Sequence, residues 1–274
     1  MMRRVSRALA VVATLAAASA AAQEPATQEP AMQESAAQES SMRESTASMT
    51  AGSERSGLEV SVGVGFQAGA GYVYKNGQRL DGTRGDLKLS DGSSGAVPVQ
   101  LEVGYRLNDT WFAGLFGQYT YVITKENPYS CPTGFDCSST LLRFGPRLQY
   151  HVSPASSFDP YVGLGVGIIM LSSSVEGQTT VPTQVGPLPA DLDIKSKTRG
   201  PEFINLTLGA RWRLSDSLSL GPALDITYNS YTVRTGTSTV NIPAAGVSQS
   251  GPISGADDGP FALFILTIRG TYNL

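Results

Sequence analysis

Histidine, cysteine and long apolar segments are scarce in this chain of 274 residues. One histidine and two cysteines, Cys131 and Cys137, supply too few ligands for an ordinary zinc site. Only 16% of the residues are charged and the formal net charge is −3, which gives a nucleic acid no electrostatic support. Beyond residue 22 no run of 18 apolar residues occurs, which excludes a membrane-spanning helix there. We therefore expect no metal, no other cofactor and no nucleic-acid partner.

The N-terminal quarter of the chain has the composition of export and linker segments. Three arginines precede a short apolar core at residues 8–17, and Ala20-Ala21-Ala22 fits a cleavage site. The following stretch repeats five-residue units such as Gln23-Glu24-Pro25 and has almost no apolar side chain to bury. We predict a cleaved signal peptide at 1–22 and a disordered periplasmic arm at 23–57, which is a flexible tether or a docking arm.

From residue 58 onward, apolar and polar side chains alternate along eight segments. In residues 58–75 one series is apolar, while the other holds Gly, Ser, Glu and Gln with Val73 as an exception. Successive side chains of a strand point to opposite faces, so each segment is predicted to be a strand with one apolar face. The other seven strands are expected at residues 97–107, 111–122, 141–152, 161–171, 202–214, 218–231 and 261–274.

The connections between these strands alternate between long and short. An even number of antiparallel strands, with short turns at one end and long loops at the other, is typical of an outer-membrane barrel. Such a sheet must close, because the backbone groups of an open edge would have no hydrogen-bond partners in lipid. The fold class predicted for residues 58–274 is therefore an all-β, eight-stranded, antiparallel up-and-down transmembrane barrel. Phe112 and Phe116 fall on the polar face, and Pro146 and Pro222 fall in mid-strand, where we expect bulges.

Alternation also fits a soluble barrel with its apolar face inside, but three observations favour an apolar outer face. The apolar set is too bulky for an eight-stranded lumen, and the Gly-rich set fits it. The polar set holds both signs of charge at matching depth. Aromatic residues of the apolar face cluster at both strand ends, as interfacial girdles do. The predicted girdle residues are Tyr72, Tyr74, Tyr105, Trp111, Tyr119, Tyr121, Tyr150, Trp212, Tyr228 and Tyr272.

The inward face is expected to carry a network of charged side chains. Because unpaired ions in so small a lumen are costly, these charges should pair, forming either a plug or a gated ion path. The predicted network consists of Glu59, Glu102, Arg106, Arg143, Arg147, Glu202, Arg211, Asp225 and Arg269. His151 faces inward near a short turn and is interpreted as structural, and no catalytic residue is expected. In an exported chain, Cys131 and Cys137 are more readily joined as a local disulfide than used as metal ligands.

The segments 159–167 (DPYVGLGVG) and 144–150 (FGPRLQY), together with the eight strands, resemble the small outer-membrane β-barrel family. That family is typified by outer-membrane proteins A, X and W and is often called porin-like. The resemblance covers residues 58–274 and is specific for fold rather than activity. It implies a monomer in the Gram-negative outer membrane, surrounded by lipid and lipopolysaccharide, whose long loops meet extracellular ligands. A plugged surface scaffold, a narrow channel and, less favoured, a lipid-modifying enzyme remain open.

Overall fold

The computed structural model describes residues 56–78, 83–128, 130–183, 186–253, 255 and 257–274. The predicted signal peptide and nearly all of the predicted arm lie outside the described residues. Within the described part of the chain, no helix is long and apolar enough to cross a membrane.

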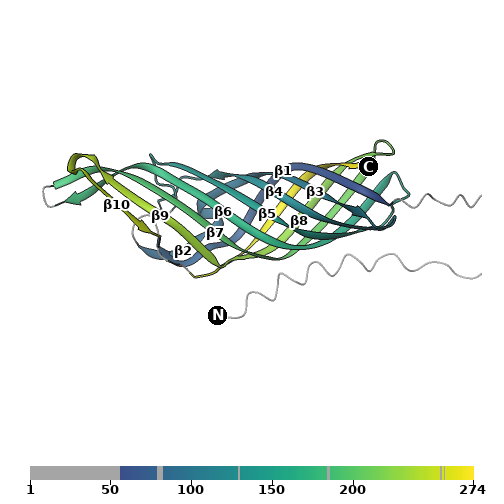
Figure 1. Cartoon of the computed structure of the whole chain (residues 1–274), viewed down its shortest axis with the longest axis horizontal. Helices are drawn as coiled ribbons and strands as arrows, with labels where there is room; N and C mark the ends of the chain where they lie inside the picture. Colours follow the sequence, from purple (N-terminus) through teal and green to yellow (C-terminus); the bar gives the residue numbers. More distant parts are fainter. Residues whose placement is uncertain (1–55, 79–82, 129, 184–185, 254, 256) are drawn as a thin grey trace, which may run out of the picture. The chain divides into compact units, whose positions relative to one another are not determined.

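Eight antiparallel strands close into a barrel, as the alternation predicted (Figure 1). Each strand pairs with the next around the ring, and the last pairs with the first in a register that runs from Glu59↔Asn273 to Gly71↔Phe261. The ring consists of β1 (Gly57–Gln78), β3 (Ser93–Arg106), β4 (Trp111–Thr124), β5 (Asp136–His151), β6 (Phe158–Thr183), β7 (Gly186–Arg213), β8 (Leu218–Tyr231) and β11 (Gly259–Asn273).

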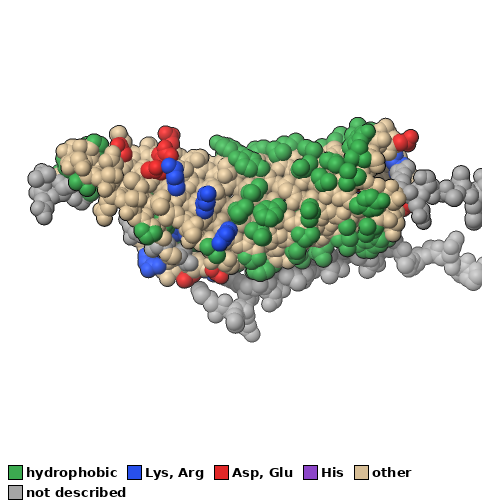
Figure 2. Space-filling view, viewed as in Figure 1, with side chains coloured by type: hydrophobic (Ala, Val, Ile, Leu, Met, Phe, Trp, Pro, Cys, Tyr) green, Lys and Arg blue, Asp and Glu red, His purple; other side chains and the backbone are tan. Residues whose placement is uncertain are grey.

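The apolar face of the barrel points outward. On β1, Val62 and Val64 expose 55% and 54% of their surface, whereas Ser61 beside them is buried. Hydrophobic side chains gather in a belt over part of the barrel's length, and charged side chains lie beyond the belt (Figure 2). A belt of exposed aliphatic side chains is stable only against lipid, so the apolar-outside alternative is confirmed and the soluble barrel is not.

Three of the predicted long loops contain regular structure, so that part of the prediction was wrong. The segment 172–200 continues β6 and β7, and the segment 232–260 holds β9 (Val233–Ile242), the 3-10 helix η1 (Pro243–Ala245) and β10 (Val247–Pro252). The first loop holds β2 (Arg84–Lys88) and the short helix α1 (Leu89–Gly92). These strands meet water rather than lipid, so they lack the apolar alternation that marks the strands of the ring.

Phe112 and Phe116 are buried inside the barrel rather than misplaced. The ring of Phe112 lies over Gly104 and Gly114, where an added Cβ would stand 2.5 and 2.7 Å from its Cζ. Glycine at these two positions therefore makes room for an aromatic ring in a narrow lumen.

The two mid-strand prolines do not cause bulges, contrary to the expectation. Pro146 pairs with Leu115 of β4, and the β5–β6 ladder has the same register on both sides of it. Pro222 likewise pairs with Ile268 of β11 within an unbroken register. Each proline is accommodated by omitting pairs on one side of its strand, without an inserted residue.

Candidate functional site

The lumen of the barrel is filled by charged side chains. All nine residues of the predicted network are buried, with exposed fractions between 0% and 8%. They fall into three layers, which lie at the short-turn end, in the middle and toward the long-loop end. Because each residue comes from an alternating strand whose outer face meets lipid, its inward direction is fixed by parity.

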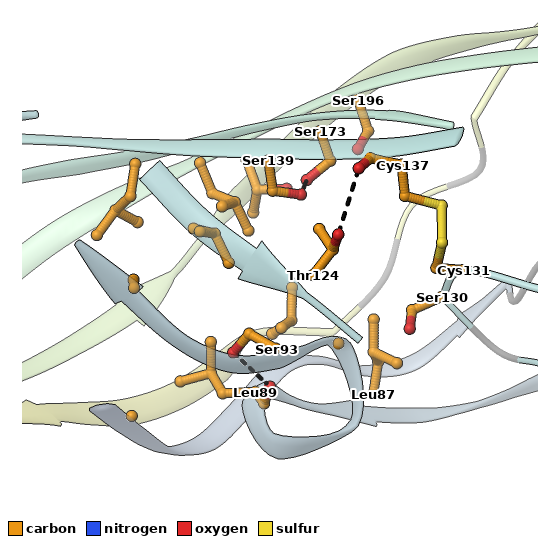
Figure 3. A pocket seen from close by; sticks show the side chains of 18 of the residues that line it. Leu87, Leu89, Ser93, Thr124, Ser130, Cys131, Cys137, Ser139, Ser173 and Ser196 are labelled. Atoms are coloured by element: carbon orange, nitrogen blue, oxygen red, sulfur yellow. Dashed lines mark hydrogen bonds between the residues drawn. A yellow bond between two sulfur atoms is a disulfide. The ribbon is translucent and has the colours of Figure 1, made fainter. Parts of the chain in front are cut away.

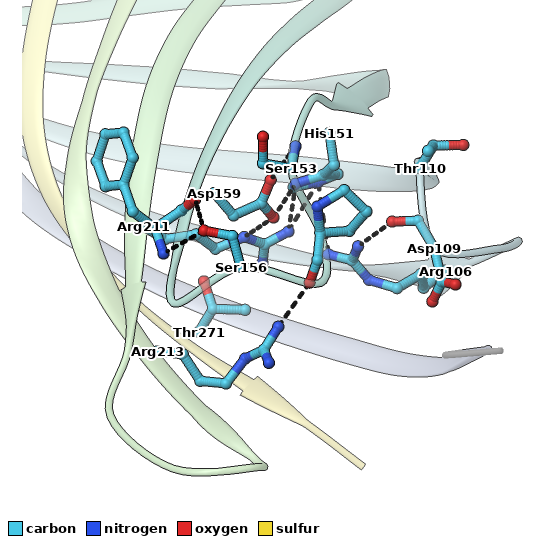
Figure 4. A network of polar contacts seen from close by, with 12 residues as sticks. Arg106, Asp109, Thr110, His151, Ser153, Ser156, Asp159, Arg211, Arg213 and Thr271 are labelled. Atoms are coloured by element: carbon cyan, nitrogen blue, oxygen red, sulfur yellow. Dashed lines mark hydrogen bonds and ion pairs between the residues drawn. The ribbon is translucent and has the colours of Figure 1, made fainter. Parts of the chain in front are cut away.

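The layer at the short-turn end is centred on Glu59. Figure 4 shows four of the residues around it, Arg106, His151, Asp159 and Arg211. Its two carboxylate oxygens accept hydrogen bonds from Arg106 Nη2 at 2.8 Å and from Arg211 Nη1 at 2.7 Å. The ring of His151 lies 2.8 Å from Asp159 through Nδ1 and also contacts the Arg211 guanidinium. This layer therefore joins strands β1, β3, β5, β6 and β7 across the barrel.

The middle layer is a four-membered ring of alternating charges. Arg147 lies 3.1 Å from Glu102 and 3.3 Å from Asp225. Arg269 contacts the same two carboxylates, at 3.6 Å from Glu102 and through a short ion pair with Asp225. Gln149 also donates to Glu102, so the carboxylate is satisfied on both oxygens.

The third layer holds a bidentate ion pair. Arg143 donates through Nε and Nη2 to the two oxygens of Glu202, at 2.8 and 2.7 Å. Its remaining Nη1 donates to Gln118. The ring of Phe116 lies between this layer and the middle one, 5.6 Å from the Arg143 guanidinium carbon and 4.6 Å from that of Arg147. Cation–π contacts therefore connect the two layers in the axial direction.

The charges of these three layers balance and leave little space. Five arginines (106, 143, 147, 211 and 269) face five carboxylates (59, 102, 159, 202 and 225). A cavity between the first two layers has a volume of about 10 Å³, which is room for about one water molecule.

The sequence prediction omitted Asp159 and the lumen glutamines. Asp159 precedes the stretch predicted as a strand and was assigned to the turn, although it has the same parity as the inward Gly163. Extending the alternation back by two residues would have placed it in the lumen. Gln100, Gln118 and Gln149 carry no charge, and a pattern based on charge does not select them.

Beyond the third layer, the lumen becomes apolar. A buried cluster joins β5, β6, β8 and β11 through Leu141, Ile169, Tyr231, Phe261, Leu263 and Ile265. Above it lies a cavity of about 160 Å³ at the long-loop end (Figure 3). Leu87 and Leu89 line it from the first loop, Val122 from β4 and Leu171 from β6, while the hydroxyls of Ser139 and Ser173 form a hydrogen bond on its wall.

The two cysteines form a disulfide on the wall of this cavity. The bridge ties the segment after β4 to the first part of β5, and Thr124 of β4 donates to the carbonyl of Cys137. The backbone of Asn127 and Cys131 closes a turn within the same segment. The disulfide therefore holds a loop against the cavity that the loop helps to enclose.

Nine of the ten predicted girdle residues are at least partly exposed, and one is buried. Eight of the ten residues expose between 39% and 58% of their surface, and Tyr72 is half-buried. Tyr74 is buried to 5% exposure and lines the outer cavity, so its assignment to a girdle was wrong. Gly71 has φ +118°, and the β1–β2 register shifts between Tyr72 and Tyr74, which breaks the alternation.

No three His, Cys, Asp or Glu side chains in the described part of the chain come together to hold a metal ion. His151 has an acid beside it in Asp159, and it also contacts the guanidinium groups of Arg106 and Arg211 and the ring of Tyr161. Arg106 and Arg211 thus stand where a nucleophile and substrate would have to approach.

Comparison with known families decides the classification. Residues 8–248 match the outer membrane protein beta-barrel domain. The chain belongs to this family. Its location is therefore the outer membrane, and the short turns face the periplasm as in other members of this architecture.

Solved structures of outer-membrane barrels are similar in fold at low sequence identity. Neisserial surface protein A is 14% identical, with 81% of this chain and 100% of that chain covered and a TM-score of 0.38. A major outer membrane protein of Thermus thermophilus is 13% identical, with 80% and 99% covered and a TM-score of 0.47. OprG of Pseudomonas aeruginosa is 15% identical, with 80% and 97% covered and a TM-score of 0.40. No curated protein matches the chain in sequence.

Proposed function

We propose that this protein is a closed outer-membrane scaffold that acts through its extracellular face and does not conduct solutes. The three layers of paired charges across the lumen carry this proposal. Opening a path would separate pairs such as Arg143–Glu202, both of which have fully buried side chains. Leaving such a charge without its partner costs about 3–5 kcal/mol, and a path needs several such separations. A gated ion path is therefore the less favoured alternative.

The surroundings of the single histidine support a role without catalysis. A hydrolase of the serine class needs a nucleophile beside the imidazole and room for the substrate. His151 is fully buried between Asp159 and two arginines, in the periplasmic half of the lumen. We infer that His151 has a structural role and stabilises the layer at the short-turn end.

Planar-bilayer conductance tests the proposal. Refolded mature protein, checked for the gel-mobility shift that folded barrels show on boiling, is expected to insert without discrete current steps. A variant that replaces Arg143 and Glu202 together by alanine removes one layer and serves as a comparison for residual leakage. Steady, discrete openings of the unaltered barrel would overturn the closed scaffold and assign the arginines to a gate.

The outer cavity supports a second function, the capture of a small apolar molecule. Its volume of about 160 Å³ is close to that of an engineered protein cavity of about 150 Å³ that binds benzene. Five leucine and three valine side chains contribute to its lining, while serine hydroxyls and Arg234 contribute polar groups. The charged layers close the floor, so a bound molecule would stay on the extracellular side.

A pair of neighbouring variants tests this second function. Ala96 is 3% exposed and lines the cavity, whereas Val97 next to it faces lipid with 40% exposed. Ala96→Leu should fill the cavity and remove the thermal stabilisation that benzene gives to the barrel in micelles. Val97→Leu should retain it. Equal stabilisation of both variants by benzene would show that the molecule partitions elsewhere.

A further inference from the structure

The outer wall of the barrel carries a groove beside Lys197 and Arg199. Figure 2 shows the apolar belt giving way to charged side chains along the barrel. The groove has a volume of about 400 Å³ and crosses β5, β6, β7 and the start of β9. Leu142 and Met170 form its apolar part, and Lys197 and Arg199 of β7 form its basic part. It opens on the outer wall, and two of its lining residues, Leu171 and Thr198, also line the outer cavity.

Strand register arranges the groove in two adjacent rows of residues, each of which ends in a cation of β7. One row runs from Tyr119 on β4 through Leu142 and Met170 to Arg199. The next runs from Tyr121 through Thr140 and Ser172 to Lys197. Tyr119 and Tyr121 are 55% and 58% exposed and belong to the outer aromatic girdle, so both rows begin at the level of the membrane interface.

The two cations of the groove are not neutralised within the described part of the chain. Lys197 and Arg199 are exposed, and neither forms an ion pair with a described residue. Lys195, one step further along β7, differs because it lies 2.8 Å from Asp193 and 4.0 Å from Glu176. The chain has a net charge of −3, so two neighbouring cations with no ion-pair partner among the described residues are unusual on its surface. Their position beside the apolar part of the groove favours the binding of an anion from outside the chain.

Below the cations, the outward side chains of β7 become apolar again. Phe203 and Ile204 are 53% and 44% exposed, and the rings of Phe203 and Tyr228 have centroids 6.0 Å apart. A ligand that fits this wall has anionic groups at the height of Lys197 and Arg199 and acyl chains that follow Leu142 and Met170 toward the belt. Phosphate is one of the anions that arginine and lysine side chains bind through charge-assisted hydrogen bonds.

We propose that this groove binds the lipid A part of lipopolysaccharide. Lys197 and Arg199 hold a phosphate group, and an acyl chain lies against Leu142 and Met170. Lipid A is the outer-leaflet lipid that combines sugar phosphates with several acyl chains, so one molecule fills both parts. The site would fix one lipid to the face of the barrel formed by β5, β6 and β7.

Native mass spectrometry of the refolded full barrel in detergent, titrated with bisphosphorylated lipid A, tests the site. The double variant Lys197→Gln, Arg199→Gln should bind lipid A about tenfold more weakly or worse, because two charge-assisted hydrogen bonds are lost. Lys195→Gln is the matched control on the same strand and should keep the affinity of the unaltered barrel. All variants change exposed side chains, and the boiling-dependent gel shift verifies that each is folded.

Two further measurements separate the parts of the ligand. Lipid A stripped of its phosphates should bind the unaltered barrel as weakly as bisphosphorylated lipid A binds the double variant. Met170→Ser should weaken lipid A binding while leaving the gel shift intact. Equal loss in Lys195→Gln, or equal affinity for phosphatidylglycerol, would overturn the proposal, since the first outcome indicates nonspecific charge and the second a general anionic-lipid surface.

Discussion

A single carboxylate, Glu102, shows how the lumen distributes its interactions. It accepts from Gln149 and faces both Arg147 and Arg269, so three strands depend on one side chain. Parity along each strand was sufficient to predict that all nine network residues face inward. The ion pairs within the network could not be predicted in the same way. Which side chains meet across the barrel depends on the stagger between strands, and alternation along one strand does not determine that stagger.

Glu102→Gln should lower the resistance of the barrel to denaturant in micelles. The change leaves two buried arginines with one carboxylate fewer, and breaking such a buried pair costs about 3–5 kcal/mol. Urea unfolding followed by tryptophan fluorescence measures the loss. Asp193→Asn, which removes an exposed partner of Lys195, is the control and should change stability by less than about 1 kcal/mol. An unchanged urea midpoint for Glu102→Gln would show that the charge network does not contribute measurably to the stability of the barrel.

At the scale of elements, the barrel and its extracellular additions depend on different contacts. The ring closes through β7–β8 and β11–β1 pairing, whereas β9 pairs with the outer part of β7 and β10 pairs with β9. The sequence predicted the ring because lipid imposes a strict apolar face on its strands. It did not predict β9 and β10, since strands in water on both faces carry no such constraint.

Replacing residues 234–252 by a short Gly-Ser linker should leave the barrel folded. The excised hairpin pairs with Asp191–Thr198 of β7, outside the segment of β7 that pairs with β8. The expected result is an unchanged boiling-dependent gel shift and a urea midpoint close to that of the full chain. Failure to refold would show that the hairpin contributes to ring closure.

The disulfide should protect the outer loop without supporting the barrel. It closes a short loop with a sequence separation of 6, so its loss should destabilise that segment locally by about 2 kcal/mol. Hydrogen exchange of a Cys131→Ser, Cys137→Ser variant should accelerate around residues 125–137, while β1 and β11 stay protected. Faster exchange across the whole ring would contradict this separation.

For the whole molecule, the position of the belt fixes how deep the barrel sits. Both tryptophans, Trp111 and Trp212, face outward beside short turns and contact the rings of Tyr150 and Phe158. Their emission should be quenched more by lipids brominated close to the headgroup than by lipids brominated near the chain end. Stronger quenching by lipids brominated near the chain end would show that the tryptophans lie deep in the bilayer, and that the belt has another position along the barrel axis.

The length of β6 and β7, at 26 and 28 residues, has a mechanical consequence. Residues 171–183 of β6 and 186–198 of β7 lie beyond the row of Met170 and Arg199, which is at the level of the outer aromatic girdle. At about 3.3 Å per residue and a tilt near 45°, this part rises on the order of 30 Å, about the thickness of the hydrocarbon layer. The hairpin of β6 and β7 therefore projects from the barrel wall into the extracellular space. A partner that binds its outer part is held at a distance from the membrane surface. Shortening the hairpin should change that distance and leave the groove beside Lys197 and Arg199 unchanged.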